Sequence, residues 1–293
     1  VISWDDLNSI AKRLRGSDIN PTALRVPAFS LYLALLEHSD PRELRKLVEQ
    51  GRILPSLYRT TLLPAQDFFH WDAPQPIDVF VGNPPWKGRR GTVTTAEQWC
   101  GERNYPVPAN DIAWGFIWKA LEDVVEGGVI GFLLPSMGVL HNTSSHQARQ
   151  TLFAKAKVAK IVNFSDLCFQ LFDGADRPTC LLVYTSMRET EDQKPYRFDY
   201  WVPKADLNLR IKRVLSLRRK DRLKLRSDAV IDDPALLKRR LWTRAPEERL
   251  LQYLKSLPRL DELVVESRYA GARTTDDKRR WVIGQGFQPA LRD

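Results

Sequence analysis

The pattern of apolar and polar positions predicts helices and strands in alternation. Residues 22–37 form an apolar run at helical spacing, and the β-rich run 77–81 is stopped by Gly82 and two prolines. Residues 129–134 are continuously apolar and are followed by Pro135, as expected of a strand that is buried on both faces. The first part of the chain therefore contains buried strands separated by helices.

The remaining elements continue this alternation. We expect a helix from Asp111 to Gly127-Gly128, a helix at 144–157, and strands at 160–164 and 179–185. Residues 87–110 are rich in Gly, Pro, Asn and Thr, so they are interpreted as a long loop. This order predicts an α/β domain with a parallel sheet over about residues 1–200.

The last third of the chain differs in composition. Segments 207–225 and 235–256 are interpreted as basic helices, and no strong strand is expected there. The net charge of the chain is +9, and residues 201–293 alone carry +10, which leaves −1 for residues 1–200. We therefore expect a basic, mainly helical extension over 201–293 that suits a polyanion such as nucleic acid; a solvated basic helix without a partner is the alternative.

Several classes of protein are disfavoured by composition. Cys100, Cys168 and Cys180 are odd in number and widely spaced, so they suggest neither a disulfide framework nor a zinc site, and no metal site is expected. No apolar run reaches the roughly 18 residues that span a membrane. Residues 1–15 mix acids, bases and polar residues, unlike a signal peptide. A cytoplasmic protein is expected.

The tetrapeptide Asn83-Pro84-Pro85-Trp86 directly follows the strand expected at 77–81. In an open α/β sheet, ligands bind outside the carboxyl ends of the strands. The two prolines stiffen the chain, and the Asn83 side-chain oxygen and the Pro84 carbonyl can each accept a hydrogen bond. Trp86 offers a flat face for stacking. This arrangement suits a planar ring with an exocyclic amine; an ordinary Pro-Pro turn is the alternative.

The tetrapeptide resembles the (D/N/S)PP(Y/F/W) motif of the amino-methyltransferases, where it holds the amine of adenine or cytosine, or a glutamine amide. Further matches, in the family's order over about residues 16–185, are Asp111 with its aromatic helix, Gly127 to Pro135 and Phe169 to Pro178. Residues 281–289 resemble the start of a target-recognition region. The chain is most similar to bacterial adenine methyltransferases related to Type IIG restriction–modification and phage-defence enzymes.

This resemblance implies a Rossmann-like class I sheet that uses S-adenosylmethionine to methylate the N6 amine of a flipped adenine in DNA. Asn83, Pro84, Pro85 and Trp86 are the implied catalytic residues, and the nitrogen attacks the methyl group directly. A protein-glutamine methyltransferase shares the tetrapeptide, and a cytosine-N4 enzyme usually has Ser in place of Asn83. A non-catalytic DNA-binding or assembly subunit is the third alternative.

Two earlier segments resemble the family's cofactor-binding motifs. Asp18, followed by Ile19, matches the acid that binds the cofactor ribose, although an Asp before a helix is commonly a cap. Asp67 and Phe68 match an acid and an apolar residue at the cofactor adenine; a surface Asp beside a core Phe is the alternative. The resemblance thus implies S-adenosylmethionine contacts at Asp18, Ile19, Asp67 and Phe68.

One departure from the family concerns its glycine-rich first motif, which should lie before Asp18. The 17 residues that precede Asp18 contain no such loop, and Gly284-Gln285-Gly286 lacks an upstream strand that ends in an acid. The glycine loop lets the backbone approach the methionine part of the cofactor. We therefore expect an N-terminally incomplete sheet that needs an upstream polypeptide, or the remainder of a larger protein, to bind the cofactor.

Overall fold

The computed structural model describes residues 3–51, 55–64, 67–73, 75–86, 93–172, 177–187, 194–258, 266–267 and 282–283. The chain divides into a larger unit, Val1–Pro234, and a smaller unit, Ala235–Asp293. Within the described part of the chain, no helix combines the length and the apolar character that crossing a membrane requires.

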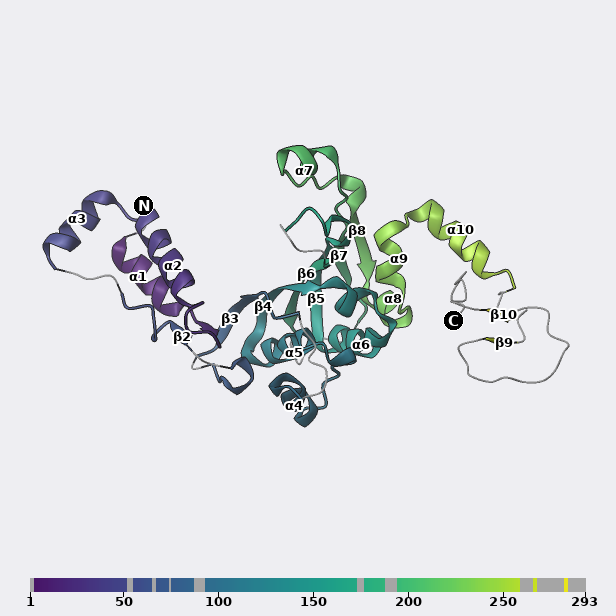
Figure 1. Ribbon diagram of the computed structural model, residues 1–293, viewed down its shortest axis with the longest axis horizontal. Helices are drawn as coiled ribbons and strands as arrows, with labels where there is room; N and C mark the ends of the chain where they lie inside the picture. The colour runs from purple at the N-terminus through teal and green to yellow at the C-terminus, as the bar shows by residue number, and fades with distance from the viewer. Residues whose placement is uncertain are drawn as a thin grey trace, which may run out of the picture. The chain divides into compact units, whose positions relative to one another are not determined.

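The larger unit is built on a six-stranded sheet with the strand order β3-β4-β6-β5-β7-β8 (Figure 1). Its strands are β3 (Ile77–Gly82), β4 (Val124–Pro135), β5 (Ala156–Asn163), β6 (Thr179–Ser186), β7 (Arg197–Trp201) and β8 (Arg222–Arg226). β3 is parallel to β4, and β5 is parallel to β7. β6 is antiparallel to both β4 and β5, and β8 is antiparallel to β7. The predicted α/β class is confirmed.

The helices of this unit are α1 (Trp4–Arg13), α2 (Arg25–Glu37), α3 (Pro41–Glu49), α4 (Thr95–Glu102), α5 (Ala113–Asp123), α6 (His146–Lys155), α7 (Leu207–Lys212) and α8 (Ser227–Asp232). Single turns of 3-10 helix are η1 (Phe68–His70), η2 (Pro108–Asn110), η4 (Thr143–Ser145), η5 (Ser165–Leu167) and η6 (Arg219–Asp221), and η3 (Met137–His141) is a π-helix.

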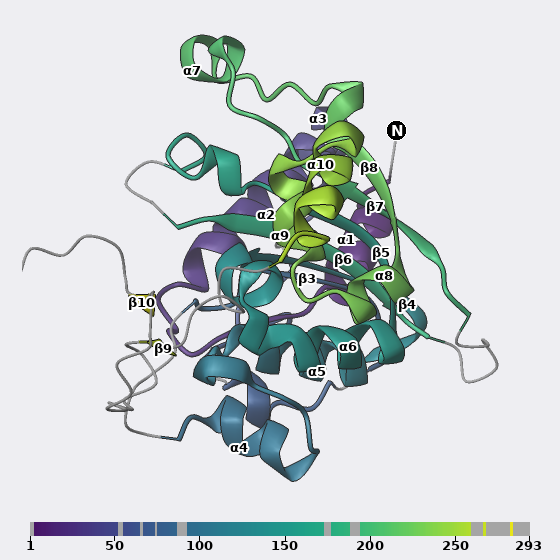
Figure 2. The same ribbon diagram turned by 90° about the vertical axis from the view of Figure 1, so that its right-hand side faces the viewer.

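Helices α5 and α6 cover the same face of the six-stranded sheet (Figures 1 and 2). The register pairs Ile130 with Tyr184 and Phe132 with Leu182, so these four side chains share that face, and all are almost completely buried. The Tyr184 hydroxyl donates a hydrogen bond of 2.8 Å to the carbonyl of Ile117 in α5. Apolar burial on this face is the main stabilising contribution to the unit.

The opposite face is less covered beside β3, which is an edge strand of this sheet. Val79 and Val81 are 63% and 74% exposed, and Val129, which pairs with Val79, is 40% exposed. Parallel strands are usually buried on both faces, and edge strands usually carry charges or are covered. The exposed face of β3 is therefore an unusual apolar surface.

The N-terminal part contains a second, two-stranded parallel sheet of β1 (Gly16–Asp18) and β2 (Leu62–Pro64). Trp4, Leu7, Leu35 and Leu57 form a separate apolar cluster that joins α1 and α2 to the segment before β2. Val26, Phe29 and Leu33 of α2 stay largely exposed. An isolated two-stranded sheet is only marginally stable, so the helices provide most of the stability of this part.

The smaller unit contains α9 (Leu236–Trp242), α10 (Ala245–Lys255) and a parallel pair of short strands, β9 (Glu266–Ser267) and β10 (Val282–Ile283). These helices confirm the prediction at 235–256. Residues 284–286 and most of the predicted match at 281–289 lie outside the described residues.

Most predicted elements are confirmed, and the exceptions have physical reasons. The sheet is mixed rather than parallel, because an apolar run does not encode the direction of its strand. Residues 222–226 form a strand instead of a helix, since Leu223 and Leu225 alternate with exposed basic residues. The sheet therefore continues beyond the compositional change predicted near residue 200.

Two further corrections concern loops. The predicted loop 87–110 contains α4, which begins with a capping box between Thr94 and Glu97 and buries Trp99. Gly127-Gly128 does not end α5, because β4 already begins at Val124 and includes both glycines.

Arg149 provides a test of how the sheet and its connections are held together. This buried side chain donates hydrogen bonds to the carbonyls of Val139 (3.2 Å), Asn142 (2.9 Å) and Pro234 (3.0 Å). Arg149→Met leaves these carbonyls without that donor, so the free energy of unfolding should fall by about 2–4 kcal/mol. Denaturant titration measures this change. The same substitution at exposed Arg210 should change it by less than about 0.5 kcal/mol; equal effects would contradict the assignment.

Candidate functional site

Three segments that are distant in sequence meet at one edge of the six-stranded sheet. The parallel strands β3 and β4 both end there, at Gly82 and Pro135. β6 begins at the same edge, because it is antiparallel to β4 and Thr179 pairs with Pro135. The connections that follow β3 and β4 and precede β6 are therefore neighbours, and the carboxyl edge is where open α/β sheets bind ligands.

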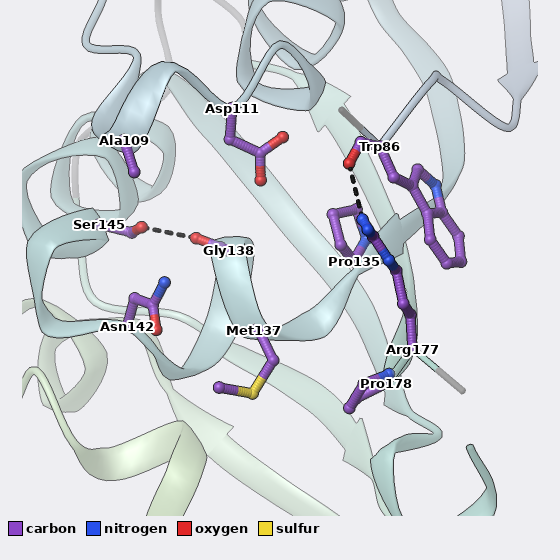
Figure 3. Close-up of a pocket in the computed structure, with 10 residues that line it drawn as sticks. All are labelled: Trp86, Ala109, Asp111, Pro135, Met137, Gly138, Asn142, Ser145, Arg177 and Pro178. Atoms are coloured by element: carbon purple, nitrogen blue, oxygen red, sulfur yellow. Dashed lines mark hydrogen bonds between the residues drawn. The ribbon is translucent and has the colours of Figure 1, made fainter. Parts of the chain in front are cut away.

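A cavity of about 370 Å³ lies at this edge (Figure 3). Its lining residues are Trp86, Ala109, Asp111, Pro135, Met137, Gly138, Asn142, Ser145, Arg177 and Pro178. The volume is within the range of small-molecule sites, about 300–1,000 Å³. The lining combines apolar surface with few polar groups, which is the usual composition of a site for a flat organic ring.

Of the predicted tetrapeptide, Trp86 lines the cavity. Its carbonyl accepts a hydrogen bond of 3.2 Å from Arg177 Nη1, which ties the loop after β3 to the segment before β6. The indole is half-buried, and its Nε1 is buried with no hydrogen-bond acceptor among the described residues. Pro84 is buried, which anchors the loop at the strand exit. Trp86 is thus positioned beside a cavity rather than within the core.

Asn83 and Pro85 are exposed at the same strand exit and are not among the lining residues. The structure therefore brings only one of the four predicted catalytic residues to the cavity wall. The role of Asn83 as an acceptor for an amine stays a prediction.

Asp111 supplies the anionic group of the cavity. Its Oδ1 accepts a hydrogen bond of 3.1 Å from the backbone N–H of Ala113, at the start of α5. Its Oδ2 lies so close to Gly138 that a Cβ at that position would collide with it. In Figure 3 the carboxylate points into the space between Gly138 and the Trp86–Arg177 contact. Glycine at 138 is therefore required for this placement of the carboxylate.

The backbone before Asp111 is held in an uncommon conformation. Ala109 and Asn110 both have positive φ, 54° and 53°. This left-handed conformation costs free energy for a residue with a Cβ, and such residues cluster at functional sites. The Asp111 backbone N–H donates to the Pro108 carbonyl, and its carbonyl accepts from the Trp114 N–H. The position of the Asp111 side chain is therefore fixed from both directions.

The charge state of Asp111 depends on two opposing effects. Burial raises the pKa of its carboxyl above the ordinary value, whereas the hydrogen bond from Ala113 and the charge of Arg177 lower that pKa. Arg177 is the only other charged residue of the lining. The net direction is upward, so the carboxylate binds a proton more readily than an exposed Asp does.

A buried polar network begins at Ser136, between the lining residues Pro135 and Met137. Ser136, between Pro135 and the π-helix, is 2.6 Å from the Ser165 hydroxyl, which donates to Asn163 Oδ1 at 2.6 Å. Asn163 Nδ2 in turn contacts His141 Nε2 at 3.0 Å and donates to the Tyr200 hydroxyl at 2.8 Å. Because these groups satisfy one another, they fix the strand ends that support the cavity.

Of the predicted cofactor residues, Asp18 ends β1 and Ile19 follows it, whereas Asp67 caps η1 and Phe68 begins it. None of the four is a lining residue of the cavity. Asp18 Oδ1 accepts from the Asn20 N–H, and Ile19 is exposed. Asp67 caps η1 through the Phe69 N–H and accepts from the Thr95 hydroxyl, so both of its oxygens have partners. Phe68 stacks on Phe116 at 4.9 Å and packs against Phe80. Their roles toward a cofactor stay predictions.

These residues fit S-adenosylmethionine only in part. Asp18 and the exposed Ile19 offer an acid and an apolar side chain at a strand end, as a ribose and an adenine ring require. The methionine part needs backbone of the kind that a glycine turn provides, and β1, the described strand that ends in an acid, is followed by Ile19-Asn20-Pro21 rather than by a glycine-rich turn. The described residues also contain no cluster of three or more His, Cys, Asp or Glu side chains suited to a metal ion.

Sequence reasoning identified Trp86 but missed most of the cavity. Asp111 was expected as the start of a helix and as part of a match to the family, and neither expectation predicted that its Oδ2 faces the cavity. Gly138, Asn142 and Ser145 carried no local signal. Arg177 belongs to the predicted loop 169–178, and only the pairing of Thr179 with Pro135 brings it to Trp86.

Comparison with known proteins identifies the family. The model of the Eco57I restriction-modification methylases matches residues 12–169, more than half of the chain. A search of curated proteins finds no match.

Solved structures of restriction–modification proteins are also similar. The methyltransferase subunit of a type I system from Streptococcus thermophilus is 12% identical with a TM-score of 0.48, covering 80% of this chain and 57% of that one. The type IIG restriction endonuclease BpuSI is 13% identical with a TM-score of 0.45, covering 90% of this chain and 35% of that one. A modification subunit of a type I restriction enzyme from Vibrio vulnificus is 15% identical with a TM-score of 0.39, covering 63% of this chain and 40% of that one.

The chain thus spans less than two thirds of the length of each of these structures. The match to the family model extends from α1 through the tetrapeptide, the cavity's π-helix and β5. On this match, the chain belongs to the Eco57I restriction-modification methylase family.

Proposed function

We propose that this chain contributes the target-base site of an enzyme that transfers a methyl group from S-adenosylmethionine to the N6 amine of adenine in DNA. The observation that carries the proposal is the cavity at the carboxyl ends of β3 and β4, bounded by Trp86 and Asp111 in a chain of this methylase family. A restriction–modification or phage-defence role in the cytoplasm follows from the same proposal.

The chemistry requires a base that has left the DNA helix. The N6 amine of a stacked adenine is inaccessible, so the base must flip into a pocket. Stacking on Trp86 recovers about 1–3 kcal/mol of the lost stacking energy. Asn83 and the Pro84 carbonyl, at the exit of β3, are the proposed acceptors for the amine, and their hydrogen bonds would favour a more electron-rich nitrogen. S-adenosylmethionine supplies the methyl group on a sulfonium sulfur.

DNA is the proposed partner because of the basic residues after position 200. Arg222, Lys224 and Arg226 project from the edge strand β8 and are exposed. Some of this charge is neutralised locally, since Lys224 pairs with Asp199 and Arg226 with Asp228. The remaining positive charge suits a phosphate backbone, and binding should weaken as salt rises.

A second candidate function is an assembly subunit that lacks independent activity. The observation that favours it is the exposed apolar edge of β3, where Val79 and Val81 are uncovered. A strand with the family's glycine loop, from an upstream polypeptide or from the remainder of a larger protein, would pair with this edge, and the segment that continues from it would cover the valines on the face of the sheet. Cofactor binding would then depend on that added strand.

The role of the tetrapeptide is tested by the substitution Asn83→Ala in a form of the protein that methylates DNA. Removing the amide oxygen should lower N6-methyladenine formation by at least about 100-fold, because positioning and preorganised dipoles supply much of the rate. DNA binding should be unchanged. Adenine methylation in a methylation-free host, read by modification-sensitive sequencing, measures the effect, and Asn104→Ala on the exposed turn after α4 is the matched control.

Two results would contradict this proposal. Near-normal methylation by Asn83→Ala would remove Asn83 from the mechanism. Methylation of glutamine peptides in preference to DNA oligonucleotides would assign the site to protein substrates instead.

The assembly candidate is tested by calorimetric titration with S-adenosylmethionine. The chain alone should bind more weakly than micromolar, and addition of a polypeptide with a strand and glycine-rich turn, encoded directly upstream, should restore micromolar binding. Val81→Lys should block that restoration, whereas Val93→Lys, at another exposed valine, should not. Micromolar binding by the chain alone would contradict the need for a complementing strand.

A further inference from the structure

We propose that Asp111 is a catalytic residue of this site, whose carboxylate accepts a hydrogen bond from one of the two N–H groups of the target amine, leaving the other to Asn83 and Pro84, and then accepts the proton that the amine loses on methylation. This inference rests on the proposed function and adds to it a residue that the tetrapeptide does not include.

The placement of the two carboxylate oxygens supports this role. Oδ1 is occupied by the Ala113 N–H. Oδ2 faces Gly138 and the cavity, and no described residue donates a hydrogen bond to it. A carboxylate oxygen in a partly apolar cavity is poorly solvated and favours a donor N–H. An exocyclic amine of a flipped base provides such a donor.

A helix-capping role explains only half of this geometry. Capping accounts for Oδ1, and a Ser or Asn would serve equally well in that position. It does not account for the absence of a side chain at residue 138, which makes room for Oδ2. Nor does it account for the left-handed residues Ala109 and Asn110, which carry Asp111 to the cavity wall. A carboxylate that faces a ligand explains all three observations.

The reaction also needs a group of this kind. The lone pair of the amine nitrogen forms a bond to the methyl carbon while the carbon–sulfur bond breaks and its electron pair stays on sulfur. The nitrogen then carries a positive charge and must lose one proton. The amide of Asn83 accepts hydrogen bonds but does not take up protons near neutral pH. Asp111 is the only carboxylate in the lining, and it passes the proton on to water.

The electrostatic setting is consistent with proton acceptance. Burial raises the pKa of Asp111, which brings the carboxylate closer to the operating pH and strengthens it as a base. The charge of Arg177 lowers that pKa in part, which favours the ionised carboxylate. No other lining residue carries a charge.

Binding of the amine is tested without any methyl transfer. The probes are thymidine oligonucleotides with one central deoxyadenosine or one central purine deoxynucleoside that lacks the 6-amine. The full chain should bind the first about tenfold more tightly by fluorescence anisotropy. Asp111→Asn keeps the hydrogen bond from the Ala113 N–H but has no anionic oxygen to accept from the amine. It should reduce this ratio of affinities to near one.

Two further variants separate this role from a structural one. Gly138→Ala places a Cβ against Oδ2 and should also abolish the ratio, although Asp111 itself is intact. Asp123→Asn changes another partly buried carboxylate of raised pKa, at the far end of α5 and outside the cavity, and should leave the ratio unchanged. No preference for the amine in the unmodified chain, or an undiminished preference in Asp111→Asn, would overturn the inference.

Proton acceptance is tested by the rate of methylation in the form of the protein that methylates DNA. Asp111→Asn should lower kcat by about 10²–10⁴-fold and raise KM by no more than about tenfold, the factor that the amine contributes to binding. The unmodified protein should lose activity as the pH falls through the raised pKa of Asp111, since the protonated acid is no longer a base; residual activity of the variant should lack that decline.

The outcomes distinguish the two proposals. If binding depends on the amine and on Asp111 but the protein methylates no DNA, the amine-binding site is retained and the proposed reaction is rejected. If Asp111→Asn does not affect DNA methylation, the proposed reaction is retained and the role of Asp111 in it is rejected.

Discussion

The hydrogen-bonded register of β3, β4 and β6 is the constraint on which the site depends. Gly82 pairs with Phe132, and Pro135 pairs with Thr179, so the ends of two parallel strands and the start of an antiparallel one meet at one edge. A shift of one residue would turn Phe132 and its neighbours to the opposite face and separate Trp86 from Arg177. Burial of Phe132 and Tyr184 beneath α5 therefore specifies the position of the cavity as well as the stability of the sheet.

Backbone restrictions then shape the cavity. Two prolines stiffen the exit of β3, two left-handed residues lead into Asp111, and a π-helix presents Gly138 where a larger residue would displace the carboxylate. The buried network from Ser136 to Tyr200 holds the adjoining strand ends. The polar groups of the site are thus preorganised before a ligand arrives, which is the property that makes electrostatic catalysis effective.

The sequence allowed the local parts of this arrangement to be predicted. A β-rich run followed by Asn-Pro-Pro-Trp specified β3 and its exit, and apolar spacing after Asp111 specified α5, because both signals depend on neighbouring residues. The direction of β6 and the meeting of Arg177 with Trp86 depend on pairing between segments about 90 residues apart, which no local pattern encodes. The strand β8 was predicted as part of a basic helix, because the alternation of leucines with basic residues is only five residues long and lies within a longer basic segment.

The central claim is that a nucleobase enters the cavity beside Trp86. Hydroxyl-radical footprinting with mass spectrometry tests it directly, because Met137 lines the cavity and is 45% exposed, whereas Met187 lies outside the lining. Saturating oligodeoxyadenylate should protect Met137 and Trp86 from oxidation, while an abasic oligomer of equal charge should not, and Met187 should be unaffected by either. Equal oxidation of Met137 and Trp86 with both oligomers would contradict the account.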